Sequence, residues 1–161
     1  MEFRKLGIVG GGTMGKSLAE KAASVGIDVV VVEVSQDKAD RARQELVAAL
    51  DRELEKWGIT ASEKKVVLAR VRFTADPGEL AATDVVVEMV TEDLGTKRKV
   101  MKQLGELCPP DRILVSNEFP EGVAVNVVGG DSYRPNRICA IAPPVLGTLP
   151  SDCDEVFHHG A

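Results

Sequence analysis

The sequence predicts an α/β fold in which helices cover both faces of a doubly wound, mostly parallel sheet. Short apolar runs alternate with longer helix-like patterns along the chain, as they do in proteins of this class. The first helix-like pattern follows a glycine-rich segment, and a helical hairpin is expected as an insertion after the second strand. The composition, with 44% hydrophobic and 28% charged residues in a chain of 161, suits one domain with a substantial core.

Six apolar segments are predicted to form strands because they are short, rich in branched residues and bounded by turn-forming residues. They cover residues 6–9, 28–32, 71–74, 84–88, 112–116 and 137–141. A short helix after Asp76 and a longer one from about Leu94 to the Pro109-Pro110 pair separate the later strands. Parallel sheets bind ligands at the carboxyl ends of their strands, so the connections that follow these ends are the expected site.

Two helical patterns separate the second and third strands. The first begins after Ser35, a residue type that favours an N-cap, and carries apolar residues at helical spacings until Trp57-Gly58. The second covers residues 63–70 and is expected to begin at a Ser62 cap. We therefore expect an antiparallel helical hairpin that projects from the sheet.

The segment between the first strand and the first helix reads Gly10-Gly11-Gly12-Thr13-Met14-Gly15 and has the spacing G-x-G-x-x-G. The first glycine of that spacing allows a tight turn, the second lets a pyrophosphate approach the backbone, and the third lets the helix pack closely on the strand. Free N–H groups at the start of the helix then face the phosphates. All six residues are expected to bind a dinucleotide in a Rossmann-type domain. The alternative is a glycine-rich turn without a ligand.

Glu33 ends the second predicted strand, about 20 residues after the glycines. An acidic residue at this position is placed to accept hydrogen bonds from the ribose diol of adenosine. The carboxylate would repel a 2′-phosphate, and no arginine immediately follows Glu33, so the sequence predicts NAD rather than NADP. The alternative is an acidic surface residue with no ligand.

Composition and charge exclude several other classes of function. The net charge is −5 and no basic patch stands out, which argues against nucleic acid as a partner. The apolar runs are far shorter than the roughly 20 residues that span a bilayer, and the chain enters its first strand too early for a signal peptide. The three cysteines, Cys108, Cys139 and Cys153, cannot all pair and lack metal-like spacing. No metal is expected, and the expected location is the reducing cytoplasm.

Further blocks follow the glycine motif in a fixed order, at residues 32–35, 88–94, 97–98, 109–111 and 114–117. With them the chain resembles the L-3-hydroxyacyl-CoA dehydrogenases, specifically their N-terminal NAD-binding domain, over nearly its whole length. The resemblance implies NAD as the cofactor and hydride transfer between NAD and a 3-hydroxyacyl thioester as the reaction. It also implies that the inserted hairpin helps to bind the CoA portion.

The resemblance assigns further residues to the cofactor side of the site. They are Val90, Glu92, Lys97 and Asn117, the last matching the first Asn of the family's Ser-Asn-Thr-Ser motif. Three of them have a plainer interpretation. Glu92 could be an acid favoured by a helix N-terminus, Lys97 could belong to the charged face that continues with Arg98, and Asn117 could form a turn.

The chain departs from the family where proton transfer is expected. The family uses a His held by a Glu to take the hydroxyl proton, and a Ser to hydrogen-bond the substrate oxygen. Phe119 stands at the position of that Ser and Ala142 at that of the His. Glu155 matches the acid, with Asp154 as the alternative. Glu118 is the candidate replacement base, because burial can raise the pKa of a carboxyl, although it could also be a solvent-facing turn residue.

Two functions therefore stay open, a dehydrogenase-like enzyme and a non-catalytic dinucleotide-binding module that acts as a redox sensor or a subunit. A variant of the enzyme interpretation keeps the chemistry but places the 3-hydroxy group on another carrier. The only histidines, His158 and His159, are expected in a solvated tail. We expect residues 1–161 to form one dinucleotide-binding domain, without the family's C-terminal helical domain. The expected partners are a small acyl-CoA or other acyl thioester and either a second copy or a separate substrate domain.

Overall fold

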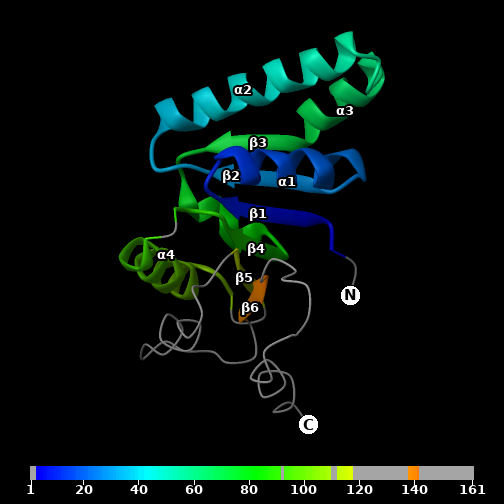
Figure 1. Cartoon of the computed structure of the whole chain (residues 1–161). Helices are drawn as coiled ribbons and strands as arrows, with labels where there is room; N and C mark the ends of the chain where they lie inside the picture. Colours follow the sequence, from blue (N-terminus) through cyan, green and yellow to red (C-terminus); the bar gives the residue numbers. More distant parts are fainter. Residues whose placement is uncertain (1–2, 92, 110–111, 118–137, 142–161) are drawn as a thin grey trace, which may run out of the picture.

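The computed structural model describes residues 3–91, 93–109, 112–117 and 138–141. Within these residues, parallel strands form one six-stranded sheet in the order β3-β2-β1-β4-β5-β6 (Figure 1). The strands are β1 (Lys5–Val9), β2 (Asp28–Val32), β3 (Val71–Thr74), β4 (Val85–Glu88), β5 (Ile113–Asn117) and β6 (Ile138–Ile141). The predicted fold class and the predicted positions of the strands are confirmed.

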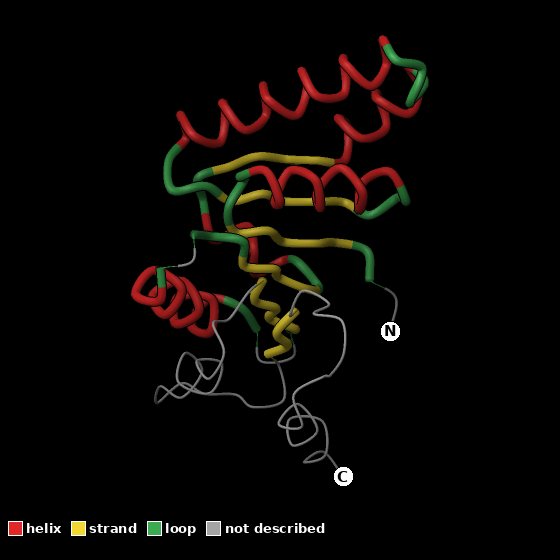
Figure 2. The backbone as a smooth tube through the Cα atoms, in the orientation of Figure 1, coloured by secondary structure: helices red, strands yellow, loops and turns green. Residues whose placement is uncertain are grey.

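Helices cover the two faces of the sheet (Figure 2). They are α1 (Thr13–Ser24), α2 (Gln36–Glu55), α3 (Ala61–Arg70), the 3-10 helix η1 (Pro77–Ala82) and α4 (Leu94–Leu107). The first three pack on one face and the last two on the other. Among the described residues, no helix is both long and apolar enough to cross a membrane.

The side chains of strand β2 contribute alternately to the two hydrophobic cores, one on each face of the sheet. Val29 and Val31 point into the cluster made with α1, α2 and α3, whereas Val30 and Val32 point into the cluster made with η1 and α4. All four side chains are buried. Because successive residues of a strand face opposite sides, a strand covered on both faces is apolar throughout. This is why β2 reads as a continuous valine run.

The predicted hairpin is confirmed, but its second cap is not the expected one. Helix α3 begins at Ala61 with Thr60 as its N-cap, two residues before the predicted Ser62. The Thr60 hydroxyl accepts a hydrogen bond from the Glu63 amide at 3.2 Å, and the Glu63 carboxylate accepts one from the Thr60 amide at 2.7 Å. This reciprocal pair satisfies two backbone donors, which a cap at Ser62 could not do with the same glutamate.

Trp57 follows the C-terminal end of α2, and its backbone adopts the left-handed conformation, with φ 59°. Its amide donates to Leu54 O at 3.1 Å and the Gly58 amide donates to Glu53 O at 2.8 Å, the two bonds of a Schellman motif. Glycine is the usual residue at this position because it pays no steric cost there. The indole is 94% exposed at the tip of the hairpin, so it gains little from packing.

We therefore expect Trp57→Gly to raise the free energy of unfolding by about 0.5–1 kcal/mol. Glycine removes the steric penalty of the left-handed conformation, and part of that gain is offset because glycine loses more conformational entropy on folding. Urea denaturation of the two proteins measures the difference. Trp57→Ala is the matched control, since it removes the indole and keeps the strained backbone. If alanine stabilises as much as glycine, the indole and not the backbone is the cause.

Asp84 ties two strands together at the amino edge of the sheet. Its Oδ2 accepts hydrogen bonds from the Arg4 and Lys5 amides, both at 2.9 Å. These bonds, with a smaller contribution from the charge of Arg112, hold the pKa of the Asp84 carboxyl below its usual value. The ionised form is thus the one that stabilises the fold.

This lowered pKa predicts an acid-dependent loss of stability. The contribution of Asp84 is fully present above the unfolded pKa of about 4 and is lost as the pH falls through the lower folded pKa. The free energies of unfolding of wild type and Asp84→Asn should therefore differ most near pH 7 and converge as the pH falls below the lowered folded pKa of Asp84. Urea denaturation across this range tests it, and a constant difference at every pH would contradict the assignment.

Candidate functional site

The connections expected to form the site lie at the carboxyl ends of the strands, on the left in Figure 1. We call this end of the sheet the carboxyl edge. Val9, the last residue of β1, is level with Val32 of β2 and with Glu88 of β4. The segments that follow these three residues therefore start side by side. The strand order also reverses between β1 and β4. Successive strands are added outward from β1 to β3 on one side of this point and from β4 to β6 on the other. Such a switch point is where doubly wound sheets bind ligands.

Two glycines of the loop after β1 are required by packing. Gly10 has φ +104°, and a Cβ there would lie 2.7 Å from Met89 O. A Cβ on Gly15 would lie 2.0 Å from Gly10 O, so the start of α1 rests directly on the turn. The Gly10 amide donates to Val32 O at 2.9 Å, which anchors the turn to β2. These contacts hold the loop close against the sheet.

Gly12 differs from its neighbours because a Cβ there would meet nothing within 4 Å. It is the N-cap of α1 and makes no side-chain capping bond, and the first turn of the helix carries no acidic residue. The start of α1 therefore presents backbone N–H groups and the positive end of the helix dipole beside a glycine open to approach. These residues fit a pyrophosphate group.

Glu33 lies directly against this loop. Its Oε1 accepts a hydrogen bond from the Gly11 amide at 2.6 Å, and its Oε2 accepts one from the Val34 amide at 3.2 Å. Its own amide donates to Thr74 O at 2.9 Å, which fixes the residue to the end of β3. The carboxylate is thus held beside the glycines, at the place predicted for the ribose diol.

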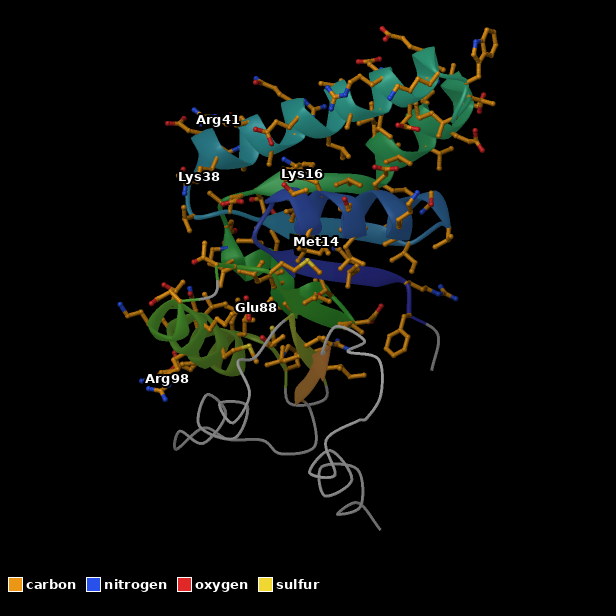
Figure 3. All side chains as sticks on the ribbon, viewed as in Figure 1. Met14, Lys16, Lys38, Arg41, Glu88 and Arg98 are labelled. Carbon is orange, nitrogen blue, oxygen red and sulfur yellow. The ribbon has the colours of Figure 1, made fainter. Side chains whose placement is uncertain are left out.

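Helix α2 is held against the start of α1. The Lys16 ammonium donates to the Glu45 carboxylate, and this bond and its charge lower the pKa of Glu45. A Cβ on Gly11 would lie 3.1 Å from the Cβ of Ala42, so the loop and α2 are close neighbours. Lys38 and Arg41 come from the first turns of α2, on the side of the carboxyl edge (Figure 3).

Lys97 does not lie on an exposed charged face, which was its plainer interpretation. Its side chain is 1% exposed, and its Nζ lies 3.0 Å from both carboxylate oxygens of Glu88. The charged-face interpretation is therefore wrong, because the ammonium is paired inside the protein. Val90 belongs to the same group, since its amide donates to Glu88 Oε1 at 2.7 Å. A direct contact of Lys97 or Val90 with a cofactor stays a prediction.

The remaining predicted residues divide into two groups. Thr13 and Met14 form the exposed start of α1, with Met14 62% exposed (Figure 3). Asn117 ends β5 level with Ile141 of β6. The other group lies outside the described residues: Glu92, Glu118 and Glu155, as well as Phe119 and Ala142. Their predicted roles remain predictions.

Sequence reasoning missed Glu88 and Ser116 as members of the site. Both are fully buried at the carboxyl ends of β4 and β5, where they are level with each other, and the Ser116 hydroxyl donates to Glu88 Oε2 at 2.6 Å. A signal was present, because a carboxylate that ends a wholly buried valine strand needs partners. The lysine one turn into the next helix was the available cation.

Comparison with known proteins identifies the family. The family model described as the NAD-binding domain of 3-hydroxyacyl-CoA dehydrogenase matches residues 5–139. This chain belongs to that family. The glycine loop and Glu33 are therefore parts of an NAD-binding domain, and the cofactor of this family of domains is NAD.

Relatives of the 3-hydroxyacyl-CoA dehydrogenase family match most of this chain. A probable 3-hydroxybutyryl-CoA dehydrogenase of Deinococcus radiodurans is 35% identical over 131 residues, which cover 81% of this chain and 46% of that protein. The 3-hydroxyadipyl-CoA dehydrogenase of Escherichia coli is 30% identical over 88% of this chain and 29% of its own length. The chain thus spans less than half of each of these two relatives.

A solved structure agrees with this placement. The crystal structure of (S)-3-hydroxybutyryl-CoA dehydrogenase from Ralstonia eutropha matches with a TM-score of 0.79 and 30% identity, over 86% of this chain and 48% of that one. The 3-hydroxyacyl-CoA dehydrogenase fold thus extends over most of this chain.

Proposed function

We propose that this chain is the NAD(H)-binding part of an oxidoreductase that transfers a hydride between NAD and a 3-hydroxyacyl thioester. The observation that carries the proposal is the glycine loop, closed by packing at Gly10 and Gly15 and open at Gly12, with the Glu33 carboxylate against it. Membership of the 3-hydroxyacyl-CoA dehydrogenase family supports the same reaction.

Each part of this edge has a distinct task in the proposed function. The start of α1 binds the pyrophosphate through backbone N–H groups, and Glu33 accepts hydrogen bonds from the adenosine ribose. Bound NAD supplies the acceptor for the hydride. The negative charge of Glu33 opposes a 2′-phosphate, so NADH is preferred over NADPH. The second half of the sheet, from β4 onward, is left for the nicotinamide and the substrate.

Calorimetric titration with NADH and NADPH, followed by NADH oxidation with 3-oxobutyryl-CoA, tests this function. We expect NADH to bind, NADPH to bind more weakly, and the thioester to be reduced only slowly at the expense of NADH, because Phe119 and Ala142 replace the family's Ser and His. A chain that binds neither nucleotide would contradict the proposal. Turnover abolished by Glu118→Gln would make Glu118 the base that replaces the family's His.

A non-catalytic dinucleotide-binding module is the second candidate. Phe119 and Ala142, which stand where the family's Ser and His are expected, favour it because neither side chain can move a proton or bind an oxyanion. The NADH oxidation assay above separates the two candidates. NADH binding without turnover, in the presence of a tenfold range of thioester concentrations, would support the module.

The proposed partners and location follow from the same reasoning. We propose an acyl-CoA or another acyl thioester as the substrate, with the rest of its site supplied by a second copy or by a separate substrate domain. The relatives are larger proteins, which is consistent with such a division. The odd number of cysteines supports a reducing cytoplasm as the location.

A further inference from the structure

A buried carboxylate lies at the carboxyl end of β4. Glu88 is fully buried, and Figure 3 shows it between β4 and α4. Its two oxygens accept hydrogen bonds from the Val90 amide at 2.7 Å, the Ser116 hydroxyl at 2.6 Å and the Lys97 ammonium at 3.0 Å. The charge is therefore paired and its oxygens are occupied, as a buried carboxylate requires.

The three donors come from three different segments. Val90 lies in the connection after β4, Lys97 lies in α4, and Ser116 lies in the neighbouring strand β5. Elsewhere β4 is purely apolar, with Val86 and Val87 buried in the sheet. The polar side chain of β4 is therefore at its carboxyl end, which lies at the switch point. We call Glu88, Lys97 and Ser116, with the Val90 amide, the β4-end cluster.

The β4-end cluster lies across the switch point from the residues assigned to adenosine. The glycine loop and Glu33 belong to the half formed by β1 to β3, which takes one mononucleotide in a doubly wound sheet. The second half begins at β4 and takes the other mononucleotide, here the one that carries nicotinamide. Met89, which follows Glu88, also touches the first half, because its amide donates to Val9 O at 2.8 Å.

We propose that Glu88 is a positioning residue for the nicotinamide half of the site. It fixes the backbone at Val90 and orients the Lys97 ammonium from inside the protein, so that the loop after β4 is set before the cofactor arrives. Preorganisation of this kind increases affinity because less ordering is needed on binding. This inference rests on the proposed binding of NAD(H), and it assigns no role to Glu88 in binding adenosine.

The test compares NADH with ADP, a ligand that keeps adenosine and the pyrophosphate but lacks the nicotinamide nucleoside. Ser116→Ala removes one donor and keeps the ion pair, so it is expected to fold. We expect it to weaken NADH binding by about fivefold, which is part of the value of one hydrogen bond to a charged group because the bond acts on the cofactor only through Glu88, and to change ADP binding by less than about twofold. Glu88→Gln should weaken NADH binding by more than about tenfold.

Asp84→Asn is the matched control, because Asp84 also accepts two backbone hydrogen bonds but lies at the opposite end of β4. Its affinities for NADH and ADP should both equal those of wild type. Hydrogen exchange of the Val90 amide without ligand is a second measurement, and it should speed up in both variants of the β4-end cluster.

Equal weakening of NADH and ADP, or no weakening of either by Ser116→Ala, would overturn the proposal. If Glu88→Gln does not fold, Ser116→Ala decides the question alone. A wild-type chain that binds neither ligand would instead contradict the proposed NAD(H) binding.

Discussion

Gly15→Ala is expected to destabilise the domain by about 3 kcal/mol and to abolish measurable NADH binding. The new Cβ would lie 2.0 Å from the backbone oxygen of Gly10, and no flexible side chain is there to move aside. Either α1 or the turn must shift, and both form the site proposed for the pyrophosphate. Urea denaturation measures the loss of stability, and calorimetric titration measures the affinity.

Two other glycines serve as controls for this prediction. A Cβ on Gly105, in α4, meets nothing within 4 Å, so Gly105→Ala should add about 0.5–1 kcal/mol of stability and leave NADH affinity unchanged. Gly12→Ala should cost under about 1 kcal/mol of stability and still lower NADH affinity by about tenfold or more. Equal stability of Gly15→Ala and wild type would show that the loop relaxes freely.

Glu33→Arg is expected to weaken NADH binding by about 10–100-fold, the equivalent of one hydrogen bond to a charged acceptor at about 1.5–3 kcal/mol. The substitution also removes the acceptor of the Gly11 amide, which holds the loop beside β2. The guanidinium can pair with a 2′-phosphate, so NADPH should bind more tightly than it does to wild type. Parallel titrations with both nucleotides measure the change in preference.

Glu33→Gln separates the two contributions of this carboxylate. The amide oxygen can still accept from Gly11, but the charge that opposes a 2′-phosphate is gone. We expect a smaller loss of NADH affinity than in Glu33→Arg and a weaker shift toward NADPH. If both nucleotides bind to Glu33→Arg as they bind to wild type, Glu33 is not at the ribose.

Much of the fold could be predicted because the signals are local. Valine runs such as 28–32, bounded by turn residues, identify strands buried on both faces, and their alternation with helices fixes a parallel sheet. The glycine spacing located the loop, and the acid at the end of β2 located its partner. The hairpin was also predicted, since Ser35 and the spacing of apolar residues in α2 mark one long helix.

The errors and omissions have physical causes of their own. Ser62 and Thr60 are both suitable caps, and only the reciprocal bond with Glu63 selects Thr60. The bond from Ser116 to Glu88 joins residues 28 positions apart, so no local pattern contains it. The burial of Lys97 depends on a different tertiary contact, its ion pair with Glu88. A lysine beside Arg98 therefore looks exposed in the sequence, although the fold pairs it with a buried acid.

The strand order also determines when the proposed cofactor site can form during synthesis of the chain. Strand β1 is made first and gains β2 soon afterwards, but its other neighbour is β4, which emerges only after the whole hairpin and β3. Until then the central strand has an unpaired edge, which is a template for aggregation. A fragment that stops before Val85 would carry this open edge permanently.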